Sequence, residues 1–215
     1  VIPCYNEAPG LPALVDRVVE AARRHGMGPD RFRLVLVENG SKDDSRAVME
    51  RLRGEPGGGY VDVVPVMPNR GYGNGIRQGL LAARPGILAW THADGQCDPE
   101  DAFRGFEIVA AADRPTLVKG RRHGRALSER VVSTTFAGLA TVILGRRLGE
   151  INAQPKVFPS ELLAQLPDPP LDFAFDLYVL ARAIEAGYAV REIDVQFPPR
   201  TYGQSNWAAT TRSKA

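Results

Sequence analysis

Apolar and polar positions alternate in two different rhythms along the chain. Between Leu11 and Ala22 the apolar residues recur every three or four positions, as in a helix with one buried face. Leu34-Val35-Leu36-Val37 is instead a short continuous apolar run, typical of a strand that is covered on both faces. Because the two rhythms follow each other to the end of the chain, they predict an α/β fold with a mostly parallel sheet flanked by helices.

The remaining elements follow from the same patterns. Strands are expected at 61–66, 87–90 and 116–118, and a final one is expected where Ile193, Val195 and Phe197 alternate with polar residues. Helices are expected at 41–52 and 71–83, after Asp98-Pro99, at 128–144 and around Phe173 to Ile184. Ser41 and Asp98 are the expected N-caps of two of them. No repeat or low-complexity linker interrupts the alternation, so residues 1–215 are expected to form a single domain.

Composition narrows the classes of protein. A net charge of +2 in 215 residues is too small to indicate nucleic-acid binding. Two cysteines, Cys4 and Cys97, do not form a disulfide framework, so we expect reduced thiols and a cytoplasmic protein. No apolar run reaches the length of a membrane span. The chain opens inside a predicted strand, and we expect that its native N-terminus lies further upstream and that an anchor can lie beyond either end.

Polar residues follow the predicted strands, where ligands bind in open α/β sheets. Pro3, Tyr5, Asn6 and Glu7 surround the end of the first strand, and Glu38 and Asn39 follow the second with groups that suit ribose hydroxyls or a base edge. A glycine-rich turn, Asn69 to Gly75 with Gly71 inside it, opens a helix whose backbone N–H groups can approach phosphates. Each segment alone is equally compatible with an ordinary loop or helix cap.

The most informative segment is Thr91 to Pro99. His92, Asp94 and Gln96 follow a buried strand at alternating positions, which in an extended segment places all three on one side. One imidazole, one carboxylate and one amide oxygen, together with the diphosphate of a substrate, can hold Mg²⁺ or Mn²⁺. The alternative is a lone Asp beside a solvated His.

Three further positions carry guanidinium groups that suit phosphates: Arg121 in the basic run 119–125, Arg130, and Arg200 after the last strand. In isolation the basic run is more typical of a solvated loop, and Arg200 of a C-terminal tail.

Taken in order, these segments resemble family 2 glycosyltransferases with the GT-A fold, in the branch of dolichol-phosphate mannose synthases and bacterial polyprenyl-phosphate glycosyltransferases. The resemblance covers nearly the whole chain. It rests on Val1 to Glu7, on Glu38-Asn39-Gly40-Ser41, on the Asn-x-Gly helix entry at Asn69, on Ala93-Asp94-Gly95-Gln96 with Asp98-Pro99, on Gly120-Arg121 with Glu129-Arg130, and on Phe173 to Arg200.

Two departures from the family pattern stand out. His92 occupies the place of the first Asp of the Asp-x-Asp metal motif, which puts the affinity and preference for metal in question. The segment 151–158 lacks the acid and the Gly-Phe pair of the synthases, so the acceptor side is expected to differ.

The resemblance implies inverting transfer of a sugar from a nucleoside-diphosphate sugar. The charge on the leaving diphosphate would be stabilised by metal at Asp94 and Gln96 and by Arg130 and Arg200. A hydroxyl acceptor needs a general base, for which Asp172 and Asp176 are the candidates, whereas a phosphate acceptor needs none. This favours a polyprenyl phosphate over a saccharide hydroxyl.

A lipid acceptor would place the protein at the inner face of the membrane. Peripheral contact through the helix at 131–144 is one interpretation of that segment, and core packing is the other.

Two alternatives come from other classes of protein. A NAD-dependent oxidoreductase would explain only the glycine-rich turn, which in that fold follows the first strand. A non-catalytic sugar-nucleotide-binding module is suggested by His92.

Overall fold

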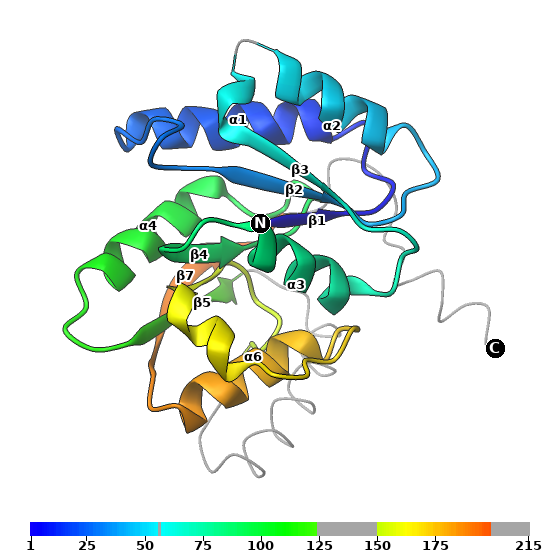
Figure 1. Cartoon of the computed structure of the whole chain (residues 1–215). Helices are drawn as coiled ribbons and strands as arrows, with labels where there is room; N and C mark the ends of the chain where they lie inside the picture. The colour runs from blue at the N-terminus through cyan, green and yellow to red at the C-terminus, as the bar shows by residue number, and fades with distance from the viewer. Residues whose placement is uncertain (56, 124–149, 199–215) are drawn as a thin grey trace.

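A computed structural model describes residues 1–55, 57–123 and 150–198. Its first half is a parallel three-stranded sheet of β1 (Ile2–Cys4), β2 (Leu34–Glu38) and β3 (Val61–Pro65), in the order β1-β2-β3. Helices α1 (Leu11–Arg24) and α2 (Ser45–Gly54) lie on one face of this sheet, and α3 (Tyr72–Ala82) lies on the other (Figure 1). A short 3₁₀ helix, η1 (Gly58–Tyr60), leads into β3.

The continuous apolar run of β2 explains this layering. Leu34 and Leu36 pack in the cluster beneath α1 and α2, whereas Val35 and Val37 pack in a cluster on the opposite face. All five residues of β2 are buried, as a strand covered on both faces requires.

The second half is a mixed sheet in the order β4-β6-β5-β7. Its strands are β4 (Ile87–Trp90), β5 (Thr116–His123), β6 (Lys156–Pro159) and β7 (Ala189–Gln196). β6 runs antiparallel to β4 and to β5, whereas β5 and β7 are parallel. Helices α4 (Pro99–Ala110) and α6 (Phe175–Glu185) cover its two faces, and η2 (Ser160–Gln165) follows β6.

Two backbone hydrogen bonds join the halves. Val1 N donates to Ala89 O (2.7 Å) and Thr91 N donates to Val1 O (3.1 Å), which is the pattern of a parallel pair. The ends of β1 and β4 therefore open at the same edge, and the polar residues that follow both strands share it.

Several expected boundaries are wrong. The helix predicted from Ser41 begins at Ser45, with Asp44 as its N-cap, because the Ser41 hydroxyl accepts a hydrogen bond from Asn6 N instead. The late helix begins at Phe175, so Phe173 precedes it. Asp98 is confirmed as the N-cap of α4, since its side chain accepts from Glu100 N. The helix expected at 128–144 lies outside the described residues.

The expectation of a mostly parallel sheet holds for β1–β3 but not for β6, an antiparallel strand that the patterns did not predict. The strand expected at 116–118 continues to His123, so much of the basic run is strand and not loop. It continues because Lys119 and Arg121 lie opposite Glu192 and Asp194 of β7. Among the described residues, no helix is long and apolar enough to cross a membrane.

Candidate functional site

The loops after β1 and β2 interlock. Asn6 Oδ1 accepts from Lys42 N (2.7 Å), and Glu7 N donates to Ser45 Oγ (2.9 Å). Asn6 has a φ of 56°, which turns the chain sharply as it leaves β1. Pro3 is part of β1, and Tyr5 follows the strand in a half-buried position. The two predicted segments therefore form one surface.

Glu38 and Asn39 form the floor of this surface. Glu38 is 2% exposed, and its Oε1 accepts from Ser41 N (2.6 Å). Asn39 is 4% exposed and donates through Nδ2 to Gly71 O (3.2 Å), while its Oδ1 has no hydrogen-bond partner among the described residues. Glu38 thus fixes the loop after β2, and Asn39 links that loop to Gly71 while its buried Oδ1 stays unpaired among the described residues.

The glycine-rich turn brings another loop against α3. Asn69 Oδ1 accepts from Gly71 N (2.8 Å), and Gly71 has a φ of 116°. A Cβ at Gly73 would lie 2.5 Å from Pro170 O, and one at Gly75 would lie 2.9 Å from Asn39 Nδ2. Asn74 N donates to Leu171 O (3.0 Å) in the same contact. The glycines therefore let α3 pack closely on Pro170 and Asn39. The Asn74 N–H is already hydrogen-bonded to Leu171 O, so it is not free to bind a phosphate.

The segment after β4 bends. Asp94 Oδ1 accepts from Gln96 N (3.1 Å), and Gly95 has a φ of 75°. The segment is therefore not extended, and the alternation argument for His92, Asp94 and Gln96 is wrong in its geometry. Gln96 Nε2 donates to Pro198 O (2.7 Å), which ties this turn to the residues after β7.

Asp94 lies at a hollow. A cavity of about 220 Å³ is lined by Ala93, Asp94 and Gly95 and, from the start of α1, by Gly10, Ala13, Leu14 and Arg17. Arg17 donates to Gly95 O (3.2 Å). A second cavity of about 240 Å³ is lined by the first residues of β1 and β2, by all of β4 and by residues at the start of α4. Of these two cavities, Asp94 lines only the first.

His92 lies under an aromatic pair. The Tyr72 ring is 5.8 Å from the His92 ring and stacks on Phe173 at 4.9 Å. Burial lowers the pKa of His92, which the Asp94 carboxylate partly offsets. The ring is therefore neutral near pH 7, which is the form that binds metal.

The residues proposed as metal ligands fit a divalent ion only if substrate phosphates complete its coordination. In the described ranges no three His, Cys, Asp or Glu side chains gather as a metal site. Asp94, the Gln96 amide oxygen and neutral His92 supply at most three ligands. Mg²⁺ and Mn²⁺ are commonly bound by one or two carboxylates together with substrate phosphates, which this edge permits.

The basic residues of β5 divide between the two sides of the strand. Arg121 is half exposed and pairs with Asp194 (2.7 Å), whose hydrogen bond raises the pKa of Arg121. Arg122 is only 10% exposed; it pairs with Glu150 (2.7 Å) and lies over the Phe197 ring (5.1 Å). Its charge is among those that lower the pKa of His92, so Arg122 lies nearer to the site than Arg121 does. Arg130 and Arg200 lie outside the described residues.

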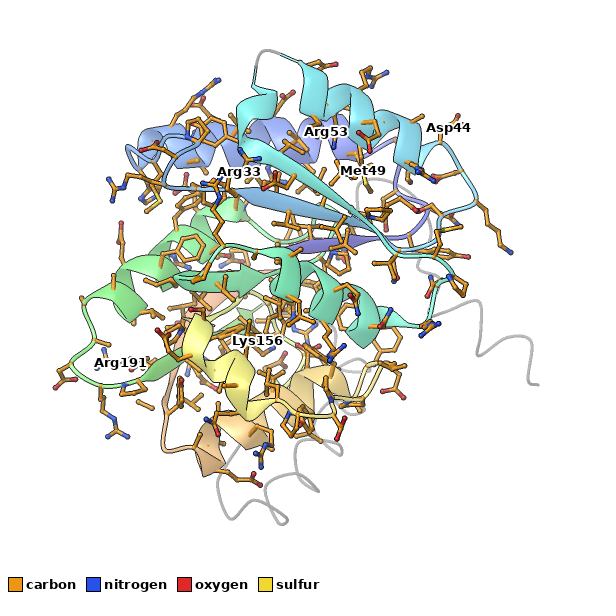
Figure 2. The ribbon with its side chains drawn as sticks, viewed as in Figure 1. Arg33, Asp44, Met49, Arg53, Lys156 and Arg191 are labelled. Carbon is orange, nitrogen blue, oxygen red and sulfur yellow. The ribbon has the colours of Figure 1, made fainter. Side chains whose placement is uncertain are left out.

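The two candidate bases lie in different surroundings. Asp172 is exposed, and its Oδ1 accepts from Ala174 N (2.9 Å) just before α6. Asp176 is 2% exposed and is held by Lys156 (2.9 Å) and Gln154 (2.8 Å). Figure 2 shows Lys156 near the centre of the molecule, whereas Arg53 and Arg191 lie at its periphery. Sequence reasoning singled out neither Lys156 nor Gln154.

Comparison with known families gives a match over residues 1–135 to the model described as Glycosyl transferase family 2. An uncharacterised glycosyltransferase of Mycobacterium bovis is 31% identical over 220 residues, covering 99% of this chain and 90% of that protein. The undecaprenyl-phosphate 4-deoxy-4-formamido-L-arabinose transferase of Shewanella sediminis is 37% identical, over 53% of this chain and 35% of that protein.

Among solved structures, glucosyl-3-phosphoglycerate synthase of Mycobacterium tuberculosis, in complex with Mn²⁺, UDP and glucosyl-3-phosphoglycerate, superposes with a TM-score of 0.71. The alignment covers 99% of this chain and 74% of that one at 17% identity, so it concerns the fold. The GT-A fold expected from the sequence is confirmed. The sequence patterns did not predict that its second sheet is mixed.

Proposed function

Because the chain belongs to glycosyl transferase family 2, we propose that it transfers a sugar, with inversion, from a nucleoside-diphosphate sugar bound at the carboxyl edge of β1, β2 and β4. The family excludes the NAD-dependent oxidoreductase. The observation that carries the proposal is the position of Asp94, which lines a hollow beside the start of α1, with Gly10 at the end of the loop after β1 on its other side.

The residues divide the work of donor binding. The nucleoside is received beside Glu38 and Asn39, where Asn6 and Glu7 belong to the neighbouring loop that interlocks with theirs. Asp94, with Gln96 and the neutral His92, holds Mg²⁺ or Mn²⁺, which neutralises charge on the leaving diphosphate when it is bound. Arg122 adds positive charge near His92. The family resemblance gives Arg130 and Arg200 the same task, and both lie outside the described residues.

We propose a UDP-sugar as the first donor to test. The structural neighbour glucosyl-3-phosphoglycerate synthase was solved with UDP and with Mn²⁺ or Mg²⁺. A second nucleoside diphosphate is equally compatible with the floor residues, so the test includes several bases.

The proposed acceptor is a polyprenyl phosphate. Its phosphate oxygen is anionic near neutral pH and attacks the anomeric carbon without a base. The undecaprenyl-phosphate transferase of Shewanella sediminis and a dolichyl-phosphate β-glucosyltransferase of Drosophila melanogaster match part of this chain. Such an acceptor implies work at the inner face of a membrane.

A saccharide hydroxyl is the second candidate acceptor, since Asp172 is an exposed carboxylate beside the loop that packs on α3. Asp172 would then remove the proton of the attacking hydroxyl. A non-catalytic nucleotide-binding module is the remaining alternative, and it predicts binding without turnover.

The test is a transfer assay with radiolabelled UDP-, GDP-, CDP- and dTDP-sugars, each with Mn²⁺ and with EDTA. The acceptors are undecaprenyl phosphate in detergent and an oligosaccharide mixture. Label that moves to the lipid only with metal supports the proposal. Label that moves to the oligosaccharide supports the second acceptor, and nucleotide binding with no transfer supports the module.

A further inference from the structure

Four polar side chains from four different parts of the fold meet below the site, three of them buried and Tyr72 partly buried. Lys156 of β6 donates to Asp176 Oδ1 of α6 (2.9 Å), and Gln154 Nε2 donates to the same oxygen (2.8 Å) and to the Tyr72 hydroxyl of α3 (3.2 Å). We call Tyr72, Gln154, Lys156 and Asp176 the buried polar cluster. Its two charged members are 1% and 2% exposed.

The cluster is fully built around the ammonium group. Besides Asp176, Lys156 Nζ donates to Ile151 O (2.7 Å) and Ala153 O (2.9 Å), so each of its three hydrogens has an acceptor. Burial lowers the pKa of Lys156, since the ammonium group loses its hydration there. Apolar side chains of similar volume are commonly as stable as a buried ion pair, so stability alone does not explain this one.

The cluster ends at the ring that contacts His92. The pKa of Tyr72 is raised well above its usual value by burial and by the Asp176 carboxylate, so the phenol stays protonated as a donor. The same ring lies 5.8 Å from His92 and stacks on Phe173. Lys156 Nζ also lies over the Trp90 ring (5.8 Å), at the end of the strand that leads to His92. The cluster is thus connected to His92 through Tyr72 and to the end of β4, just before the turn, through Trp90.

The Asp176 carboxylate cannot reach the hydroxyl of a sugar acceptor. A general base must lie within hydrogen-bonding distance of the proton that it removes. The Asp176 carboxylate is instead 2% exposed, with one oxygen shared between an ammonium and an amide. Of the two candidate bases, Asp172 and Asp176, only Asp172 faces solvent.

We propose that Lys156 and Asp176 are positioning residues, which act through Gln154 and Tyr72 to hold His92 and the turn bearing Asp94 in the geometry needed for sugar transfer. The inference rests on the proposed function. It assigns the acid of α6 and the lysine of β6 to positioning the His92–Gln96 turn rather than to proton removal or to contact with the nucleoside.

The main test replaces the pair by apolar residues, in the double variant Lys156→Met with Asp176→Val. Removing both charges leaves no unpaired ion inside. The expected variant is folded and binds UDP in EDTA within about threefold of wild type, while kcat with Mn²⁺ falls about tenfold or more. A folded variant with wild-type kcat would overturn the proposal. The control is Arg182→Gln with Glu185→Gln, an exposed pair on the same helix, for which no change is expected.

A second variant covers the case in which the double variant does not fold. Tyr72→Phe removes only the hydroxyl that Gln154 contacts, and it is expected to lower kcat about threefold or more with little change in Tm. An unchanged kcat, or a fall in Tm that alone explains the loss, would overturn the proposal.

The two proposals fail differently. If wild-type protein transfers sugar and the variants do so equally well, only the positioning role is lost. If wild-type protein transfers nothing, the proposed function is lost, and positioning is read from the ¹⁵N and ¹³C resonances of His92. There are three histidines in the chain, so His92→Gln assigns the signal. The His92 signal should shift in Tyr72→Phe, and an unmoved signal would contradict the inference.

Discussion

The two halves of the sheet place charge in opposite ways. In the half formed by β1, β2 and β3, the interior strand β2 is apolar up to Glu38, whose carboxylate caps a backbone N–H at the edge. In the half formed by β4 to β7, Lys119 and Lys156 are each 1% exposed and are paired with acids of β7 and α6. The first half therefore keeps its interior strand apolar. The second half buries two lysines, and each of them needs an acidic partner that only the native arrangement places beside it.

This difference assigns the halves different parts of the function. The first half supplies loops whose polar atoms bind backbone groups of their neighbours and form the proposed donor floor. The second half carries the His92–Gln96 turn, which Tyr72 of α3 contacts and which a hydrogen bond from Gln96 ties to Pro198 after β7. Substitutions in the two halves should therefore separate donor binding from transfer.

The largest expected effect follows Asp94→Asn. The variant keeps the acceptor for Gln96 N but loses the charge proposed to hold the metal, so turnover should fall about 100-fold or more. Initial rates with saturating donor and Mn²⁺ measure this. Asp98→Asn is the matched control, since Asp98 caps α4 and makes only a long, exposed contact with Arg17 (3.8 Å), so turnover should stay near that of wild type. Equal losses in both variants would contradict the assignment.

Next is Lys156→Met alone. It leaves Asp176 as an unpaired buried charge, and unfolding free energy should fall by about 3–5 kcal/mol. Arg33→Met breaks the partly exposed pair with Asp62 in the first half, and about 1 kcal/mol or less is expected. Urea denaturation of both variants measures their unfolding free energies. Comparable losses in the two variants would contradict the proposed difference between the halves.

A smaller effect is expected for Gly73→Ala. The added Cβ would meet Pro170 O at 2.5 Å and Phe175 Cβ at 2.7 Å, and such overpacking costs about 1–3 kcal/mol. Gly54→Ala is the comparison, because a Cβ there meets no atom within 4 Å and the residue ends a helix. If both variants unfold at the wild-type urea midpoint, α3 does not pack on the 170–172 loop as described.

The smallest effect is on acid stability. The Arg33 hydrogen bond lowers the pKa of Asp62, and the hydrogen bond from Arg24 lowers that of Glu100. Each group is therefore stabilising above its unfolded-state pKa, and that contribution is lost as pH falls below about 4. Asp62→Asn should flatten the fall of Tm between about pH 5 and pH 3 slightly, because the pair is exposed. A steeper fall would contradict the sign.

Local signals predicted most of the first half and the helix after Asp98. The β2 run, the α1 periodicity and the Asp98-Pro99 start each depend on neighbours in sequence, and each is confirmed. Ser41 failed as an N-cap because its hydroxyl is engaged by Asn6, a contact between distant residues.

The second half was less predictable because its polar residues are buried by distant partners. β6 begins with Lys156, which as a local pattern argues against a buried strand, and its partner Asp176 lies on a later helix. Arg122 was not singled out because the basic run was interpreted as a loop. Once 116–123 is known to be a strand, Arg121 and Arg122 must face opposite sides. The family, which is confirmed, and the edge at which we propose the site both follow from the order of the motifs.

The most direct test of the account is a calorimetric titration of UDP into wild-type protein and Asp94→Asn, each with Mn²⁺ and with EDTA. The account predicts that Mn²⁺ strengthens UDP binding about tenfold or more in wild type and leaves it unchanged in the variant. Equal strengthening by Mn²⁺ in both proteins would show that Asp94 does not hold the ion, and the proposed site would be wrong.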